Sequence, residues 1–169
     1  MSAPTDRGRS GVGYVLHALI ADDGLLRAAT GDIAEARVVP LRQGLSLVPM
    51  TDDLFDAVTD GGPADALGFW RLPGGFDELL ARWSAHGPIA YAEAEYFAGT
   101  GEQRAAVWAD GALALGPLES PPGPGDPEAV GPISLALRRL GARSSPGEDE
   151  FQSVELNRHR STDAWLPPT

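Results

Sequence analysis

Two glutamates within the stretch IAYAEAEYFAGTGEQR, residues 89–104, form the pattern in this sequence that is nearest to catalytic chemistry. In an extended strand, Glu93 and Glu95 share one face and lie about 6.6–7 Å apart along it. On a sheltered face, two carboxylates this close raise the pKa of one of them, which is how an acid–base pair is made. Aromatic residues on the same face indicate partial shelter. The alternation is equally typical of a solvent-facing or a partner-binding sheet surface, and these three interpretations stay open.

The charge balance favours the partner-binding interpretation. The chain carries 24 acidic and 13 basic residues, which gives a formal net charge of −11. A field of this sign repels phosphate backbones and anionic lipid, so we expect neither a nucleic-acid nor a membrane partner. The same field attracts basic proteins and accelerates association with them, so we expect a basic protein partner. The alternative is that the acidity only keeps the chain soluble.

We expect the binding face to combine the glutamate strand, the loop after it and an acidic helix that steers the approach of the partner. The aspartates at 52, 53, 56 and 60 lack the spacing of a calcium loop and are interpreted as a solvated helix face. The predicted partner-binding residues are Glu93, Glu95, Tyr96, Gln103, Arg104, Asp52 and Asp56.

Histidine and arginine residues elsewhere are candidates for polar support of this face. His17 lies inside an apolar run, a setting more typical of a hydrogen-bonded sheet residue than of a general base. Near the C-terminus, Arg158 and Arg160 would pair with the two glutamates if this segment packs back over the sheet. A frayed terminus is the alternative, although Trp165 favours docking. The candidate support residues are His17, Arg158, His159 and Arg160.

Counting residue types removes most covalent and metal chemistry. The chain has no cysteine, and its 13 basic residues are all arginine, which excludes disulfides, thiolate metal sites, cysteine nucleophiles and Schiff-base lysines. The three histidines stand far apart, without a local metal-ligand spacing. Gly99-Thr100-Gly101 begins like a dinucleotide fingerprint, but Arg104 occupies the third glycine position and a strand is expected next. We therefore expect no metal and no cofactor.

Periodicity and turn signals predict the element order β-α-β-β-α-α-β-β-β-α. The clearest helix covers Phe76 to Trp83, and Asp110-Gly111 is a strong hairpin turn. Because hairpins outnumber crossovers, we predict an α+β fold, a mostly antiparallel sheet with helices packed on one face. The predicted organisation is a disordered tail over 1–11, a single domain over 12–166 and an exposed proline-rich loop over 117–132.

Neither a membrane span nor a secretion signal is expected. The longest strongly apolar run, residues 12–21, is about half the length that a bilayer requires. Asp22 and Asp23 end this run abruptly and no cleavage site follows it. We therefore predict a cytoplasmic protein.

Several segments of the chain resemble a family of bacterial proteins of similar length that has no established activity. These segments are GYVLHALIAD, ARVVPLRQGLSLVPMTDDLFD, GPIAYAEAEYFAGTGEQRAAVWADGALALGPL, PISLALRRLGA and DEFQSVELNRHRSTDAW. The family motif is EAEYF-(G/A)-G-x-G-x-Q, with Ala98 at the variable position here. The resemblance implies no catalytic residues. In size and charge the chain is also similar to immunity proteins of bacterial toxin systems, which is an analogy of type.

Three functions follow as hypotheses. The first is an acidic protein-binding module, an immunity-like inhibitor of a basic toxin or enzyme. The second is a small metal-independent enzyme that uses the Glu93/Glu95 carboxylate pair in hydrolysis or isomerisation, with support from His17 or His159. The third is an accessory or structural protein that forms oligomers through exposed aromatic residues such as Trp70.

Overall fold

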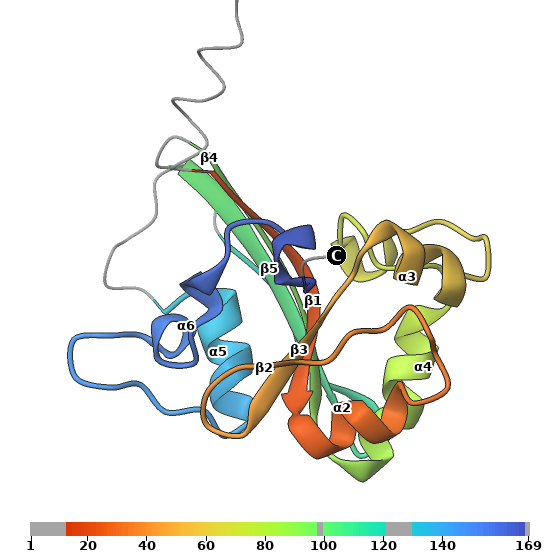
Figure 1. The fold of residues 1–169 in the computed structure, drawn as a ribbon, viewed down its shortest axis with the longest axis horizontal. Helices are drawn as coiled ribbons and strands as arrows, with labels where there is room; N and C mark the ends of the chain where they lie inside the picture. The colour runs from red at the N-terminus through yellow and green to blue at the C-terminus, as the bar shows by residue number, and fades with distance from the viewer. Residues whose placement is uncertain (1–12, 98–99, 121–129, 168–169) are drawn as a thin grey trace, which may run out of the picture.

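The computed structural model describes residues 13–97, 100–120 and 130–167, so the tail predicted over 1–11 lies outside the described residues. The described residues form one antiparallel sheet with the strand order β2-β3-β1-β4-β5-β6 (Figure 1). The central strands β1 and β4 are neighbours in space although two other strands separate them in the chain. The strands are β1 (Tyr14–Asp22), β2 (Val39–Pro40), β3 (Leu45–Pro49), β4 (Ile89–Phe97), β5 (Thr100–Ala109) and β6 (Ala112–Glu119).

The antiparallel pairing of all six strands, together with the helices, confirms the α+β class. Helices cover both faces of this sheet, which corrects the prediction of helices on one face. Figure 1 shows the sheet nearly edge-on, with α5 and α6 on one side and α2, α3 and α4 on the other. The helices are α2 (Asp23–Ala29), α3 (Asp52–Val58), α4 (Phe76–Trp83), α5 (Pro132–Arg139) and α6 (Glu150–Ser153). Short 3₁₀ turns are η1 (Ala66–Gly68), η2 (Ser84–His86), η3 (Leu156–Arg158) and η4 (Asp163–Trp165).

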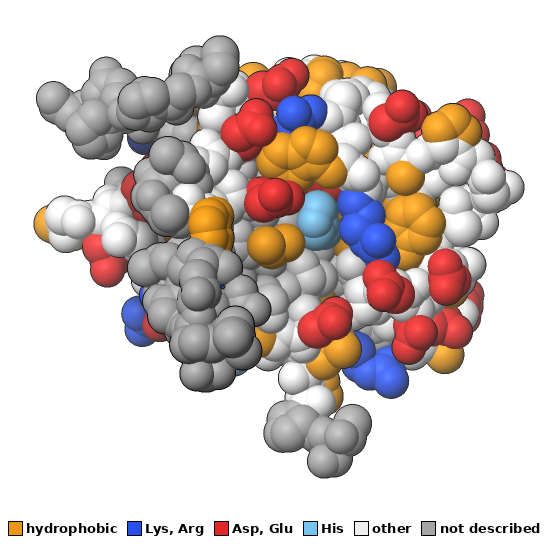
Figure 2. Space-filling model, turned by 90° about the horizontal axis from the view of Figure 1, so that it is seen from above, with side chains coloured by type: hydrophobic (Ala, Val, Ile, Leu, Met, Phe, Trp, Pro, Cys, Tyr) orange, Lys and Arg blue, Asp and Glu red, His pale blue; other side chains and the backbone are white. Residues whose placement is uncertain are grey.

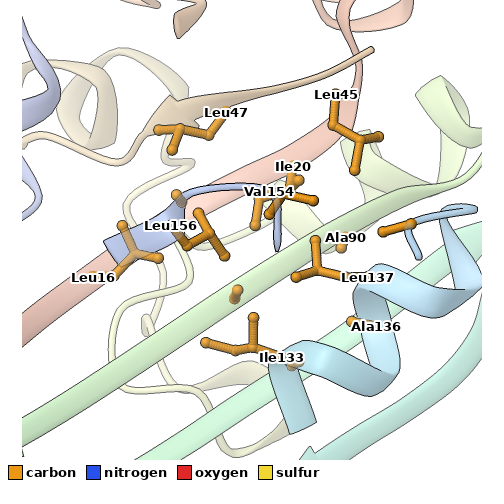
Figure 3. Packing of buried hydrophobic residues seen from close by; sticks show 14 of the residues in the cluster. Leu16, Ile20, Leu45, Leu47, Ala90, Ile133, Ala136, Leu137, Val154 and Leu156 are labelled. Carbon is orange, nitrogen blue, oxygen red and sulfur yellow. The ribbon is translucent and has the colours of Figure 1, made fainter. Parts of the chain in front are cut away.

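Apart from Glu93, the buried residues of the central strands β1 and β4 are apolar on both faces, and this accounts for the two helical layers. Leu16 and Ile20 of β1 point into one buried cluster, which α5 and residues 154–156 complete (Figure 3). Leu19, on the opposite face of β1, belongs to the second cluster with α2, α3 and α4. A strand that is buried on both faces reads as a continuous apolar run, since neither set of alternate residues meets water.

Local signals fix a hairpin turn, as predicted, and the start of a helix. Asp110 and Gly111 both have positive φ, 54° and 86°, as a two-residue hairpin turn requires, and they join β5 to β6. The Thr51 side chain accepts a hydrogen bond from the Leu54 amide and so caps α3. This cap starts α3 directly after β3, next to the middle of β1.

The proline-rich connection starts later than predicted. Strand β6 continues through Glu119, and α5 already begins at Pro132. Residues 121–129 of the predicted loop lie outside the described residues. None of the described helices has the length and apolar character needed to cross a bilayer.

Candidate functional site

A histidine and a glutamate face each other at the centre of the sheet. His17 of β1 is the register partner of Glu93 of β4, and the two side chains lie on the same face. The His17 Nδ1 atom lies 2.9 Å from the Glu93 Oε2 atom. The Glu93 side chain is completely buried, and the His17 side chain is 12% exposed. The pair therefore has a buried end and an end that reaches the surface.

The loop between α3 and α4 supplies two further donors to the Glu93 carboxylate. The Trp70 amide donates to Oε1 at 2.6 Å, and the Arg71 amide donates to Oε2 at 2.7 Å. Tyr91, two residues before Glu93 on the same face, donates its hydroxyl to the Arg71 carbonyl at 2.5 Å. Burial raises the pKa of Tyr91 well above its ordinary value, and the nearby carboxylate adds to this, so this hydroxyl stays a donor at neutral pH.

These contacts fix the tautomer of the histidine. An ionised carboxylate can only accept hydrogen bonds, and Glu93 already receives two amide hydrogens. The His17 Nδ1 atom therefore donates its hydrogen to Glu93, and in the neutral form of the ring Nε2 carries the free lone pair. Nε2 has no hydrogen-bond partner among the described residues and is not enclosed, so it is open to solvent.

The C-terminal segment, residues 158–165, completes the sheet beside His17. Strand β3 pairs with β1 only from Ala18 onward, so the first half of β1 has an open edge. Residues from the C-terminal segment fill this edge: the Val15 amide donates to the Arg160 carbonyl at 2.9 Å, and the His17 amide donates to Thr162 Oγ1 at 3.1 Å. On this edge of β1, His17 and Val15 are therefore bound by residues that are far from them in the chain.

A pocket of about 280 Å³ opens beside His17, between the end of β3 and residues 161–163. Figure 2 shows one face of the molecule, on which a histidine side chain lies beside basic side chains with acidic and hydrophobic side chains around it. The residues that line the pocket are Val15, His17, Met50, Thr51, Asp52, Arg71, Ser161, Thr162 and Asp163. The pocket thus combines the free face of His17 with a guanidinium, two carboxylates and hydroxyl groups.

Arg71 is held at its backbone while its guanidinium stays near solvent. Its amide and carbonyl are bound by Glu93 and Tyr91, and its guanidinium lies 4.7 Å from the centre of the Phe55 ring. The guanidinium pairs with Asp52, whose side chain is 91% exposed. An exposed ion pair of this kind contributes little to stability, so an incoming anion can replace Asp52 at small cost.

Trp70 packs beside His17, and the Arg104 guanidinium also contacts its ring. The Trp70 ring lies edge-on to the His17 ring at 6.5 Å, and the Arg104 guanidinium lies 4.5 Å from the Trp70 ring. Arg104, the register partner of Glu93 on β5, also donates to the Gly68 carbonyl. Three neighbouring strands thus each contribute one residue to this region. Glu93 and Arg104 bind the loop, and His17 binds Glu93.

The prediction that Glu93 and Glu95 form one sheltered pair of carboxylates is wrong. Glu93 is buried under the loop, whereas Glu95 is exposed, so the two glutamates do not share a sheltered environment. For the same reason Glu93 cannot contact a partner protein. The buried partner of Glu93 is instead His17.

The predicted partner face also divides between the two sides of the sheet. Tyr96 and Gln103 lie on the face of α5, where the Gln103 amide donates to the Tyr96 hydroxyl at 2.7 Å. Arg104 and Glu95 lie on the opposite face, because alternate residues of a strand point to opposite sides. Asp52 and Asp56 are exposed on α3, on the side of the sheet that carries His17.

The C-terminal support residues dock on the fold but do not reach the glutamates. Arg158 pairs with Glu155 at 2.9 Å, donates to the Pro40 carbonyl and lies over the Trp165 ring. The His159 ring packs against Trp165 at 4.6 Å between ring centres. Arg160 contributes its carbonyl to β1, while its side chain is exposed on the other face. The expected pairing of Arg158 and Arg160 with Glu93 and Glu95 is therefore absent among the described residues.

Sequence reasoning missed the loop residues Trp70 and Arg71 and the contribution of Thr162. A glutamate in the middle of an otherwise apolar strand was the available signal, because a buried carboxylate needs donors from elsewhere in the chain. Among the described residues, no group of histidine, aspartate and glutamate side chains is arranged to hold a metal ion. No protein-family model, curated protein or solved structure matches this chain.

Proposed function

We propose that the chain is an enzyme in which His17 transfers protons to and from a small polar substrate bound in the pocket beside Arg71. The observation that carries this proposal is the double role of one oxygen atom. Glu93 Oε2 accepts from the His17 ring at 2.9 Å and from the Arg71 amide at 2.7 Å. One buried carboxylate therefore holds both the ring of His17 and the backbone of Arg71, whose guanidinium lines the same pocket.

The proposed chemistry is general acid–base catalysis in hydrolysis or isomerisation. The free lone pair of His17 Nε2 takes a proton from the substrate or from a water molecule, and the imidazolium returns it in a later step. Glu93 stabilises the positive charge that forms on the ring between these steps, as a buried carboxylate does in a catalytic triad. The Arg71 guanidinium binds an anionic group of the substrate and opposes negative charge that develops during the reaction. We place this activity in the cytoplasm.

Activity-based metabolite profiling tests this proposal while the substrate is still unidentified. The purified protein is incubated with a small-molecule extract, and mass spectrometry follows which compounds are consumed or formed. We expect at least one conversion that His17→Gln slows by roughly a hundredfold or more. His86→Gln is the matched control, because His86 is exposed at the end of η2, away from the pocket. A set of conversions that is identical for both variants would overturn the proposal.

A second candidate function is the binding of a basic protein by an immunity-like inhibitor. The observation that favours it is the exposed end of the sheet, where Glu95 and Glu102 are register partners on β4 and β5. Like charges directly opposite each other destabilise a sheet. Arg104 lies 4.0 Å from Glu102 and offsets part of this cost, and a basic partner would reduce it further. Val15, 38% exposed and the register partner of Glu95 on β1, adds an apolar contact beside them.

Charge removal at this end of the sheet tests the second candidate. The double variant Glu95→Gln with Glu102→Gln should retain less basic protein in affinity capture at low salt, and high salt should abolish the difference. The double variant Asp32→Asn with Glu35→Gln removes the same number of charges from exposed positions between α2 and β2 and serves as the control. Equal capture by both double variants would show that only the net charge matters and would remove this surface from consideration.

A further inference from the structure

A second pocket lies on the opposite face of the sheet from His17. It has a volume of about 360 Å³ and is lined by Tyr14, Tyr96, Gln103, Asp149, Phe151, Gln152, Asn157 and Arg160. Three aromatic rings form its wall: the Tyr14 ring lies 6.4 Å from the Tyr96 ring and 5.5 Å from the Phe151 ring. Aromatic walls of this kind offer edge and face contacts to a flat ring.

The Tyr96 hydroxyl is oriented so that its hydrogen is available to a ligand. It accepts a hydrogen bond from Gln103 Nε2 at 2.7 Å, so its own hydrogen points elsewhere and has no acceptor among the described residues. The other end of the same amide is fixed, because Gln103 Oε1 accepts from the Ile133 amide at 3.0 Å. Burial raises the pKa of Tyr96, so the hydroxyl keeps its hydrogen at neutral pH.

The guanidinium of Arg160 lines the same pocket. The Arg160 side chain is exposed and makes no ion pair with any described residue. Its backbone is nevertheless fixed, because its carbonyl accepts from the Val15 amide in β1. The pocket therefore presents a hydroxyl donor and an exposed cation on a fixed backbone, beside an aromatic wall. Arginine suits a carboxylate because its planar fork can donate two parallel hydrogen bonds.

We propose that this pocket binds a small planar ring that carries one carboxylate. The ring packs against the aromatic wall, and the carboxylate accepts from the Tyr96 hydroxyl and the Arg160 guanidinium. Asp149, which caps α6 through its bond to the Gln152 amide, places a negative charge in the same pocket, and this charge acts on Tyr96. Arg160 offsets this charge when one carboxylate binds, and a second carboxylate would add repulsion. The site therefore favours a monocarboxylate over a dicarboxylate.

Titration with sodium benzoate, followed by two-dimensional NMR, tests this site directly. We expect saturable shifts of the Gln103 side-chain amide and of the amides of residues 149–160. Tyr96→Phe and Arg160→Gln should each weaken benzoate binding by roughly five- to tenfold, because each removes a hydrogen bond to a charged acceptor. Cyclohexanecarboxylate, which lacks the flat ring, and phthalate, which carries a second carboxylate, should both bind more weakly than benzoate.

Controls separate this site from the one at His17 and from general charge attraction. Arg143→Gln removes another exposed arginine, outside the pocket, and should leave benzoate binding unchanged. His17→Gln should also leave it unchanged, so failure of the proposed enzyme function would not affect this result. The absence of saturable shifts, or shifts that centre on His17 and Arg71, would overturn the proposal. Equal weakening by Arg143→Gln and Arg160→Gln would overturn it as well.

Discussion

The imidazole of His17 and the carboxylate of Glu93 stand directly opposite each other on neighbouring strands, 76 residues apart in the chain, with 2.9 Å between Nδ1 and Oε2. The carboxylate is completely buried and also receives two backbone amides of the loop that precedes α4. One side chain therefore joins the centre of the sheet, the loop and the pocket.

Replacement of Glu93 by glutamine should destabilise the protein and release the loop. An amide presents hydrogens where the carboxylate has only acceptors, so at least one buried donor loses its partner. We expect a loss of about 1–3 kcal/mol in the free energy of unfolding, measured by denaturant titration. Glu95→Gln, the same change at an exposed position on the same strand face, is the control and should be neutral or slightly stabilising, because it removes a like charge opposite Glu102. Equal stability of the two variants would contradict the anchoring role of Glu93.

Replacement of Thr162 by valine should loosen the C-terminal segment beside His17. The His17 amide would lose its acceptor at 3.1 Å, which we expect to cost about 1 kcal/mol. Hydrogen exchange at the His17 amide should become faster in this variant. Ser161→Ala changes the adjacent exposed residue and is the control. In this variant, hydrogen exchange at the His17 amide should be as slow as in the unchanged protein. Unaltered protection of His17 in Thr162→Val would show that the backbone pairing alone closes this edge.

All three tyrosines should ionise only at alkaline pH beyond their ordinary range. Burial raises the pKa of Tyr14, Tyr91 and Tyr96 above 10.0. In the unfolded chain these groups lose their protons near pH 10, so the folded state binds more protons there and its stability falls as the pH rises further. The ultraviolet absorbance of tyrosinate should therefore appear together with unfolding, which circular dichroism reports. Tyrosinate that forms at pH 10 in the fully folded protein would contradict this.

Asp23 should titrate below the ordinary range of an aspartate. Hydrogen bonds from Arg27 first and Ser46 second hold the pKa of this carboxyl below 3.8. The stabilisation from the lowered pKa is present above the unfolded value and disappears as the pH falls through the folded one. An NMR titration of the Asp23 carboxyl carbon measures the midpoint. Ser46→Ala should move that midpoint upward, because it removes a donor at 2.6 Å from Oδ1. An unchanged midpoint would assign the whole effect to Arg27.

Much of the local structure could be predicted from the sequence, because it depends on contacts between near neighbours. Strict alternation over residues 89–97 predicts which side chains share a face of β4, and the structure confirms this for the buried alanines and for Tyr91. Asp110-Gly111 and Thr51 specify a turn and a helix cap through their own backbone and side-chain preferences. The apolar character of both faces of β1 also indicates two covering layers, a signal that the prediction of a single helical layer overlooked.

The candidate site was decided by tertiary structure. Alternation determines that His17 and Glu93 each point to one face of a strand, but only the pairing of β1 with β4 places them opposite each other. The same holds for the Trp70 and Arg71 amides and for Thr162, which come from segments whose own sequence carries no periodic signal. A buried carboxylate must be satisfied by donors, yet any backbone amide can serve, so the residue type alone does not identify its partner. The sequence by itself therefore determined the strands, turns and faces, and the long-range packing of the sheet, the loop and the C-terminal segment decided where chemistry can occur.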